Sequence, residues 1–230
     1  GCSILYNLAA RGLTNTILLE RDVLGSGSTG RSSSAIRMHY SNEVHARMAW
    51  QSLEIFRNFE LMVGGDCGYI QTGYLVFVGE DEVEPFRANT AMQQKIGIQT
   101  SLINHEEARE IAPGFHVDDC AGIAYEPLSG HADASATGYA YATRARRLGA
   151  TVHLQAPASR IEVSGGRVVA VNTGAERIET PIAVVATGPW SRHFLLGHDI
   201  DLPLESTRHE VVHFKRSLDA GKPQQLMTNG

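Results

Sequence analysis

The feature that most constrains the fold is the spacing between Gly1 and Glu20. A segment with apolar residues at helical spacing, 2–12, follows Gly1 and ends in a glycine. The apolar segment 15–20 then predicts a buried parallel strand that ends at an acidic residue. This order predicts one helix-to-strand step of a doubly wound α/β sheet, although any amphipathic helix before a strand would give the same pattern.

The same spacing indicates a dinucleotide-binding unit. In such a unit the helix N-terminus receives the pyrophosphate, and an acid about 20 positions along the chain binds the ribose hydroxyls. Gly1 and Glu20 fit that distance. If Gly1 is the third glycine of the fingerprint, the first strand and the other two glycines precede this sequence. We then expect the 230-residue chain by itself to bind its cofactor poorly and to be inactive.

Charge and cysteine content exclude several classes of function. The net charge is −5 and no run of lysine or arginine occurs, so we expect neither nucleic acid nor a membrane surface as partner. Cys2, Cys67 and Cys120 are widely spaced, which predicts no disulfide framework and favours a reducing compartment, the cytoplasm. No apolar run approaches the roughly 18 residues of a membrane span, and the scattered histidines predict no metal site.

The pattern along the chain predicts a domain that is split in sequence. After the first step come a loop rich in glycine and serine, 24–37, and a long helix, 43–60. A strand-rich part follows, with a hairpin at 71–73, strands at 74–78, 100–103 and 122–126, and helices at 82–96 and 105–111, the second capped by Asn104. The nucleotide-type pattern then returns with a helix at 134–148, a strand at 151–154, a hairpin joining 160–163 to 167–171, and a second buried strand at 182–186.

Three segments together resemble one family of flavoproteins. They are 1–21, which ends in Leu19-Glu20-Arg21, then 25–31 followed by Ile36-Arg37, and 184–191, which contains Thr187-Gly188-Pro189-Trp190-Ser191. They are similar to the FAD-dependent amine and amino-acid oxidoreductases of the D-amino-acid oxidase type, which include glycine oxidase, sarcosine oxidase and dimethylglycine dehydrogenase. The resemblance covers nearly all 230 residues.

The resemblance implies an α/β fold in which a Rossmann-like FAD-binding domain is split by a strand-rich α+β substrate domain. We expect the FAD-binding domain in 1–70 and 131–197. The first part of the substrate domain is expected in 71–130, and the start of its second part in 198–230.

The resemblance also implies a set of cofactor-binding residues. Glu20 would bind the ribose, Arg21 would lie beside the adenine, and the hydroxyls and the guanidinium of the 25–31 loop would contact the diphosphate or the flavin. Arg31 could equally be a solvated loop arginine, and Thr187-Gly188 a plain strand-to-helix turn. The full expected set is Gly1, Glu20, Arg21, Ser28, Thr29, Arg31, Ser32, Ala158, Thr187 and Gly188.

Arg37 is the candidate catalytic residue. In the sarcosine oxidases an arginine in a similar I-R-x-x-Y segment lies near the flavin, where a guanidinium could bind a substrate carboxylate. Alternatively, Arg37 is structural and pairs with Glu43 or caps the next helix. His39 is the nearest nucleophile for covalent flavin attachment, but Ala132 stands where a related subunit carries its flavin-linked histidine. We therefore expect FAD to be non-covalent.

The expected function is oxidation of the C–N bond of a small amine or amino acid, of the sarcosine, dimethylglycine or glycine type. Hydride would pass to flavin N5, and oxygen or another acceptor would reoxidise the cofactor. Two alternatives stay open, a nicotinamide-dependent Rossmann dehydrogenase and a non-catalytic flavin-binding subunit or fragment.

Overall fold

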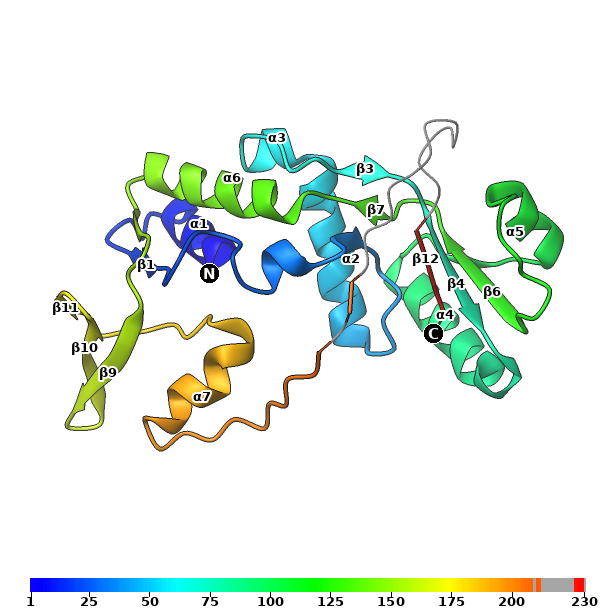
Figure 1. Cartoon of the computed structure of the whole chain (residues 1–230). Coiled ribbons are helices and arrows are strands. Elements are labelled where there is room, and N and C mark those ends of the chain that lie inside the picture. The colour runs from blue at the N-terminus through cyan, green and yellow to red at the C-terminus, as the bar shows by residue number, and fades with distance from the viewer. Residues whose placement is uncertain (209, 212–225, 230) are drawn as a thin grey trace. The chain divides into compact units, whose positions relative to one another are not determined.

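The computed structural model describes residues 1–208, 210–211 and 226–229, and it divides into two compact units. The first unit comprises Gly1–Ser32 and Ala134–Val212, and the second comprises Ser33–Asp133 and His213–Gly230. Each unit is therefore built from two separate stretches of the chain, as the colours of Figure 1 show. Part of the predicted range 198–230 lies outside the described residues.

The first unit combines helices with a parallel pair of strands and an antiparallel hairpin sheet. Its parallel pair is β1–β8, and its hairpin sheet has the order β11-β10-β9. Its elements are α1 (Cys2–Ala10), β1 (Ile17–Leu19), the 3₁₀ helix η1 (Thr29–Arg31), α6 (Ala134–Arg147), β8 (Thr151–His153), β9 (Ala158–Ser164), β10 (Arg167–Thr173), β11 (Arg177–Glu179), the 3₁₀ helix η3 (Gly188–Trp190) and α7 (Ser191–Leu196).

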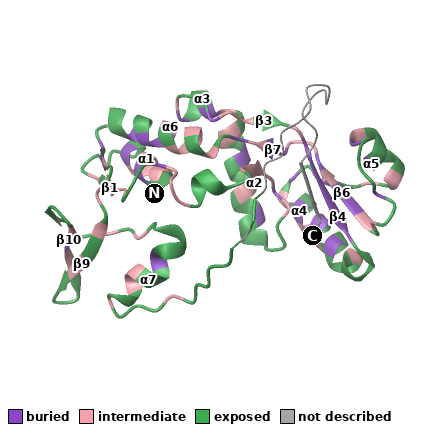
Figure 2. Cartoon of the chain, viewed as in Figure 1, coloured by how far each residue is buried: buried purple, intermediate pink, exposed green. Residues whose placement is uncertain are grey.

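The core of the first unit lies between α1, α6 and β8. Leu5 and Ala9 of α1 pack against small residues of α6, Ala142 and Ala145, and against Val152 of β8. The small side chains of α6 allow the two helices to approach closely. The helix at 2–12 and the strand within 15–20 are confirmed, and the buried face of α1 appears in purple in Figure 2. The strand is less buried than predicted, because Ile17 is exposed and its two neighbours in β1 are half-buried.

The predicted strand at 182–186 is wrong. In the described residues this segment pairs with no strand, and Ile182 and Val184 are 74% and 60% exposed. A parallel strand needs a neighbour to satisfy its backbone groups, and β1 and β8 pair only with each other in the described part. An apolar run thus predicts a buried strand only where a sheet edge is present to receive it.

The second unit consists of two sheets with helices around them. The larger sheet has the order β12-β4-β6-β5, and the smaller one β2-β7-β3. Its elements are β2 (Ala35–Ile36), α2 (Glu43–Arg57), α3 (Phe59–Met62), β3 (Ile70–Gln71), β4 (Tyr74–Val78), the 3₁₀ helix η2 (Glu80–Glu82), α4 (Val83–Ile96), β5 (Ser101–Leu102), α5 (His105–Ile111), β6 (Gly122–Glu126), β7 (Gly130–His131) and β12 (Leu226–Asn229).

Helices cover both faces of the larger sheet, as Figure 1 shows for α4 and α5. Alternate residues of β4 point to opposite faces, so Leu75 packs toward Ala108 of α5, whereas Val76 packs toward Phe86 of α4. Every residue of β4 is buried, which explains why its sequence is a continuous apolar run.

The predicted hairpin at 71–73 is also wrong. β3 pairs with β7, whereas β4 pairs with β6 and β12, so the two neighbouring strands belong to different sheets. The backbone N–H groups of Thr72 and Gly73 both donate to Ser129 O, and Gly73 has φ +77°. These bonds turn the chain out of the smaller sheet and into the larger one instead of folding it back.

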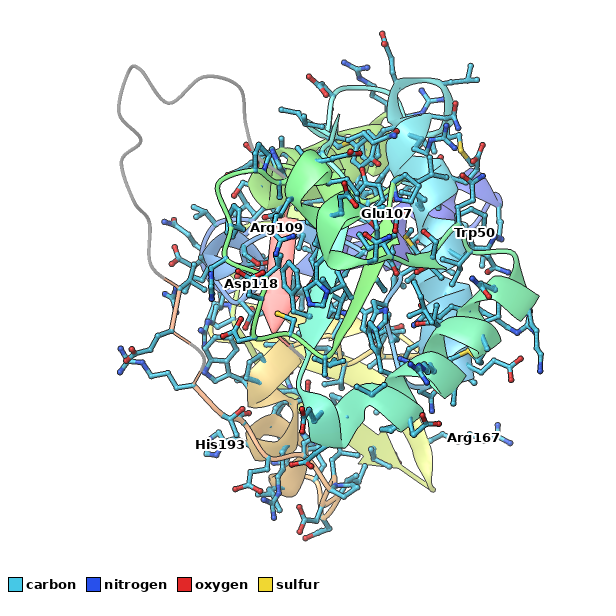
Figure 3. The ribbon with its side chains drawn as sticks, turned by 90° about the vertical axis from the view of Figure 1, so that its right-hand side faces the viewer. Trp50, Glu107, Arg109, Asp118, Arg167 and His193 are labelled. Atoms are coloured by element: carbon cyan, nitrogen blue, oxygen red, sulfur yellow. The ribbon has the colours of Figure 1, made fainter. Side chains whose placement is uncertain are left out.

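The capping of α5 is confirmed. The Asn104 side chain accepts hydrogen bonds from the N–H groups of Glu106 and Glu107, and Glu107 accepts one from the Asn104 N–H, which completes a capping box. Figure 3 shows Glu107 and Arg109 on this helix, and Arg109 pairs with Asp118 in the following loop. Local hydrogen bonding therefore fixes where α5 begins.

Asn104→Ala is expected to lower the free energy of unfolding by about 1 kcal/mol, because two N–H groups of the first helical turn lose their acceptor. Chemical denaturation followed by circular dichroism measures the loss. Glu110→Ala, on an exposed position of the same helix, is the matched control and should change stability by less than ~0.5 kcal/mol. Equal effects of the two substitutions would contradict the assigned role of the cap.

Candidate functional site

The helix α1 approaches β1 closely at Gly1. Gly1 is the N-cap of α1, and a Cβ there would lie 3.3 Å from Leu18 Cδ1 of β1. A larger residue would require the Leu18 side chain to shift by a few tenths of an ångström. No side chain caps this end of the helix at its N-cap position, which leaves backbone N–H groups of the first turn for an anion.

Glu20 stands where the parallel pair ends. It follows β1 directly, its N–H donates to His153 O of β8 at 2.9 Å, and its Oε1 accepts from the Asp22 N–H at 3.0 Å. The Glu20 side chain is half-buried. A carboxylate is thus held at the carboxyl ends of β1 and β8, the edge at which parallel sheets bind ligands.

Arg21 stacks on Trp190. The Arg21 Cζ lies 4.0 Å from the Trp190 ring centroid, and a Cβ on Gly27 would lie 3.4 Å from Cζ3 of the same ring. The guanidinium is planar and weakly hydrated, so it favours an aromatic face. Trp190 thereby joins the three predicted segments in one place, after β1, in the glycine-rich loop, and in the turn at 187–191.

The glycine-rich loop closes on itself through Gly25 and Gly30. The Gly30 N–H donates to Gly25 O at 2.9 Å, Gly25 has φ +84°, and a Cβ on Gly30 would collide with that same oxygen. Both positions therefore require glycine. The predicted contacts Ser28, Thr29, Arg31 and Ser32 lie on or beside this turn, and all four are exposed.

Two further predicted segments lie beside this region. The Ala156 N–H donates to Glu20 O at 2.8 Å, which places the start of β9 at Ala158 close to the end of β1. Thr187 Oγ1 lies 3.0 Å from Ser191 Oγ, and Gly188 has φ +58° at the start of η3. The predicted cofactor residues thus all belong to the first unit.

Arg37 belongs to the second unit. Its Nη1 donates to His39 O, and its Cζ lies 4.7 Å from the Tyr40 ring centroid and 5.7 Å from that of Tyr74. Glu43 pairs with Arg47 instead, at 2.7 Å. The Asn42 side chain caps α2, and among the described residues no ion pair involves Arg37. The guanidinium is therefore oriented by a carbonyl and two rings, not by a carboxylate.

Glu126 is the residue that the sequence did not single out. It ends β6 with 0% exposure, and its Oε2 accepts from the Met38 N–H at 3.0 Å and from Ser129 Oγ at 2.7 Å. Burial raises the pKa of its carboxyl. The available signal was an acidic residue that ends an otherwise uncharged strand segment, immediately before a proline.

His39 lies against Glu126 and is only 12% exposed at its side chain. Burial, followed by the charge of Arg37, lowers the pKa of its imidazole to about 4, so the ring is neutral near pH 7. Its ring packs 5.4 Å from that of Phe86. Ala132, the position compared with a flavin-linked histidine, is buried in the same unit.

The rest of the described chain shows no second centre of chemistry. Within the described ranges, no three histidine, cysteine or acidic side chains gather as a metal would require. Among the same residues, no helix has the length and apolar character needed to cross a bilayer. Cys2, Cys67 and Cys120 are free thiols.

The first unit fits a dinucleotide cofactor. A glycine cradle that a Cβ would fill, exposed hydroxyls beside it, a carboxylate after β1 and an uncapped helix N-terminus are the groups that a pyrophosphate and a ribose require. These groups come from segments that lie together within one unit.

Known proteins share both the sequence and the fold. The family model described as "FAD dependent oxidoreductase", called DAO, matches residues 1–229. Human mitochondrial sarcosine dehydrogenase is 26% identical over 223 residues, which cover 94% of this chain and 24% of that protein. The mouse mitochondrial pyruvate dehydrogenase phosphatase regulatory subunit is 25% identical, with 93% and 24% covered.

Among solved structures, L-proline dehydrogenase from P. horikoshii superposes with a TM-score of 0.80 and 30% identity, over 86% of this chain and 53% of that one. The chain spans about a quarter of the length of the two curated relatives. The family match extends over almost every residue and includes each segment of the candidate cofactor site. The chain therefore belongs to the DAO family of FAD-dependent oxidoreductases.

Proposed function

We propose that this protein oxidises the C–N bond of a small amine or amino acid, of the sarcosine, dimethylglycine or glycine type, with FAD as cofactor. The observation that carries the proposal is the gathering of Arg21, which follows Glu20, the 25–31 loop and the turn at 187–191 around Trp190 in one unit. The family match favours FAD over the nicotinamide alternative.

The two units would divide the work. We assign FAD to the first unit and substrate recognition to the second. The FAD-binding ranges expected from the sequence were 1–70 and 131–197, whereas the first unit comprises Gly1–Ser32 and Ala134–Val212, so this assignment moves 33–70 to the substrate-binding part. In the first unit Glu20 would bind ribose hydroxyls, and Arg21 would lie beside the adenine. The N–H groups at the N-terminus of α1, together with Ser28, Thr29, Arg31 and Ser32, would bind the diphosphate and flavin side. Ala158, Thr187 and Gly188 would offer backbone contacts to the adenosine.

The second unit would supply the charge that orients the substrate. A guanidinium binds a carboxylate through two parallel hydrogen bonds. Among the described residues, no protein carboxylate forms an ion pair with Arg37. When bound, FAD would supply the two-electron acceptor, with hydride leaving for its N5. Arg37 would hold the substrate so that its C–N carbon is presented in one orientation.

We propose non-covalent FAD. His39, the nearest candidate nucleophile, has a mostly buried ring that packs on Phe86 and faces Glu126 within its own unit. Ala132 cannot form a bond to a flavin. Precipitation of the protein with acid should release the yellow colour into the supernatant.

A second candidate, a flavin-binding regulatory subunit without activity, is favoured by one observation. The mouse protein that is 25% identical to this chain is named as a phosphatase regulatory subunit. Both candidates bind FAD, so only turnover separates them.

The test is anaerobic reduction of the FAD-loaded protein, followed at the flavin band near ~450 nm. We expect sarcosine, dimethylglycine, glycine or proline to bleach the band, and the corresponding amines without a carboxylate to act far more slowly. Sodium dithionite is the positive control for a reducible flavin. A flavin band that dithionite bleaches and that no amine or amino acid bleaches would favour the regulatory subunit. Absence of any flavin from the full-length protein would contradict both candidates, whereas poor FAD binding by residues 1–230 alone is the expected result.

A further inference from the structure

A buried carboxylate lies under the segment that carries Arg37. Glu126 is fully buried, and in the described part of the chain no lysine or arginine pairs with it. Removing a carboxylate from water is unfavourable unless hydrogen bonds compensate for the lost hydration. The bonds that Glu126 makes therefore indicate what holds it at this position.

One oxygen of Glu126 accepts from a backbone N–H far away in sequence. Its Oε2 receives the N–H of Met38, 88 positions earlier in the chain, at 3.0 Å. Ser129 Oγ donates to the same oxygen at 2.7 Å, and both Met38 and Ser129 are 0% exposed. The hydroxyl of Ser129, in the turn after β6, thus fixes the carboxylate, and the carboxylate in turn holds the peptide group between Arg37 and Met38.

Other bonds fix the next residues of the same segment. The Tyr40 N–H donates to Met38 O at 2.9 Å, and Gln93 Nε2 of α4 donates to Tyr40 O at 3.3 Å. Arg37 itself donates to His39 O. The segment 37–40 follows β2 and pairs with no strand in the part of the chain that the structure describes, so these side-chain and turn hydrogen bonds determine its path.

Among the described residues, the second oxygen of Glu126 has no hydrogen-bond partner. Oε1 lies 3.9 Å from His39 Nδ1, for which the described part of the chain also offers no partner, and this distance is too long for a hydrogen bond. The charged or titratable groups around Glu126 are Arg37 and His39, both on the segment that it holds. A carboxamide at 126 would keep the acceptor for Met38 and would place an N–H₂ group opposite the neutral ring nitrogen.

We propose that Glu126 is a positioning residue, whose hydrogen bond to the Met38 N–H sets the direction in which Arg37 presents its guanidinium to a substrate carboxylate. The role lies in accepting a hydrogen bond and not in carrying a charge or moving a proton. The inference rests on the proposed function of Arg37.

The test compares Glu126→Gln with Glu126→Met in the FAD-loaded protein, with the amino acid that bleaches the flavin as substrate. Glutamine keeps the acceptor, so KM should stay within about threefold of the parent value. Methionine has a similar length and no comparable acceptor, so KM should rise about tenfold while kcat changes less than about threefold. The affinity for acetate, a carboxylate that does not react, should fall by the same factor when followed by its perturbation of the flavin spectrum.

Several outcomes would overturn the proposal. A Glu126→Met protein with the parent KM and acetate affinity would show that Arg37 needs no such support. A Glu126→Gln protein whose KM rises as strongly as that of the methionine variant would show that the charge or the proton matters instead. If Glu126→Met fails to fold, Ser129→Ala provides the test of the positioning role, because removing the hydroxyl that orients Oε2 should raise KM about two- to fivefold. An unchanged KM in that variant would also reject the role.

Arg37→Ala separates this proposal from the one on which it rests. If Arg37→Ala leaves acetate affinity unchanged, the assignment of Arg37 fails whatever Glu126 does. If Arg37→Ala abolishes acetate binding while Glu126→Met does not weaken it, only the positioning role fails.

Discussion

Arg37→Ala is expected to lower kcat/KM for a carboxylate-bearing amine by about 10²- to 10³-fold, while the protein retains its full complement of FAD. Two charge-assisted hydrogen bonds to a carboxylate together account for a loss of roughly 3–4 kcal/mol when both are removed. The kcat/KM of Arg37→Lys should lie between that of the parent protein and that of Arg37→Ala, because an ammonium cannot form the paired hydrogen bonds of a guanidinium. Steady-state kinetics with flavin content measured for each preparation provides the comparison.

The matched control is Arg47→Ala. Arg47 lies on α2 of the same unit, is exposed, and pairs with Glu43, so its loss should leave kcat/KM within about twofold. An amine without a carboxylate gives the second control, since Arg37→Ala should hardly affect its turnover. Equal losses for substrates with and without a carboxylate would mean that Arg37 maintains the structure of the segment and does not bind substrate.

Gly130→Ala is expected to lower the free energy of unfolding by about 3 kcal/mol, one of the largest effects of a single methyl group in this chain. Gly130 lies in β7, the middle strand of the small sheet, and a Cβ there would collide with the Ile70 carbonyl group and lie 3.0 Å from Gln71 Cα. The obstructing atoms are backbone, so no side-chain rotation relieves the collision. The strands β3 and β7 would have to separate.

Chemical denaturation of the purified variant measures this loss, and thermal unfolding should show a midpoint lower by roughly 6–12 °C. Gly138→Ala is the matched control, because Gly138 lies within α6 and its Cβ would have no neighbour within 4 Å. That substitution should stabilise the protein by up to ~1 kcal/mol, since alanine favours a helix over glycine. A stable Gly130→Ala protein would mean that β3 does not pair with β7 in solution.

Local patterns predicted much of the fold. The long amphipathic helices, the cap of α5 and the hairpin joining β9 to β10 follow from periodicity, a capping residue and a glycine-rich turn, all of which act over a few residues. The segment 182–186 and the turn at 71–73 were mispredicted because their outcome depends on distant partners. One lacks a neighbouring strand in the described part, and the other is redirected by Ser129.

The candidate site divides in the same way. Glycines and acids at fixed spacing predicted the cofactor residues of the first unit, since the geometry of a phosphate-binding turn depends on residues that are close together in the sequence. Trp190 as the platform for Arg21 could not be inferred, because 169 positions separate them. The helices α2, α3, α4 and α5 and the strands β3, β4 and β5 separate Met38 from Glu126 along the chain, and neither segment indicates in its own sequence that it meets the other.

The two tryptophans lie in different units. Trp50 belongs to α2 and packs against the buried cluster that includes Leu53 and Ile98, whereas Trp190 stacks on Arg21 in the other unit. The sequence contains no other tryptophan. Replacing Trp50 by phenylalanine would leave tryptophan emission from the candidate cofactor region alone, and replacing Trp190 would leave tryptophan emission from the second unit alone. Each unit thus contains one tryptophan, whose fluorescence reports the local unfolding of that unit without an added label.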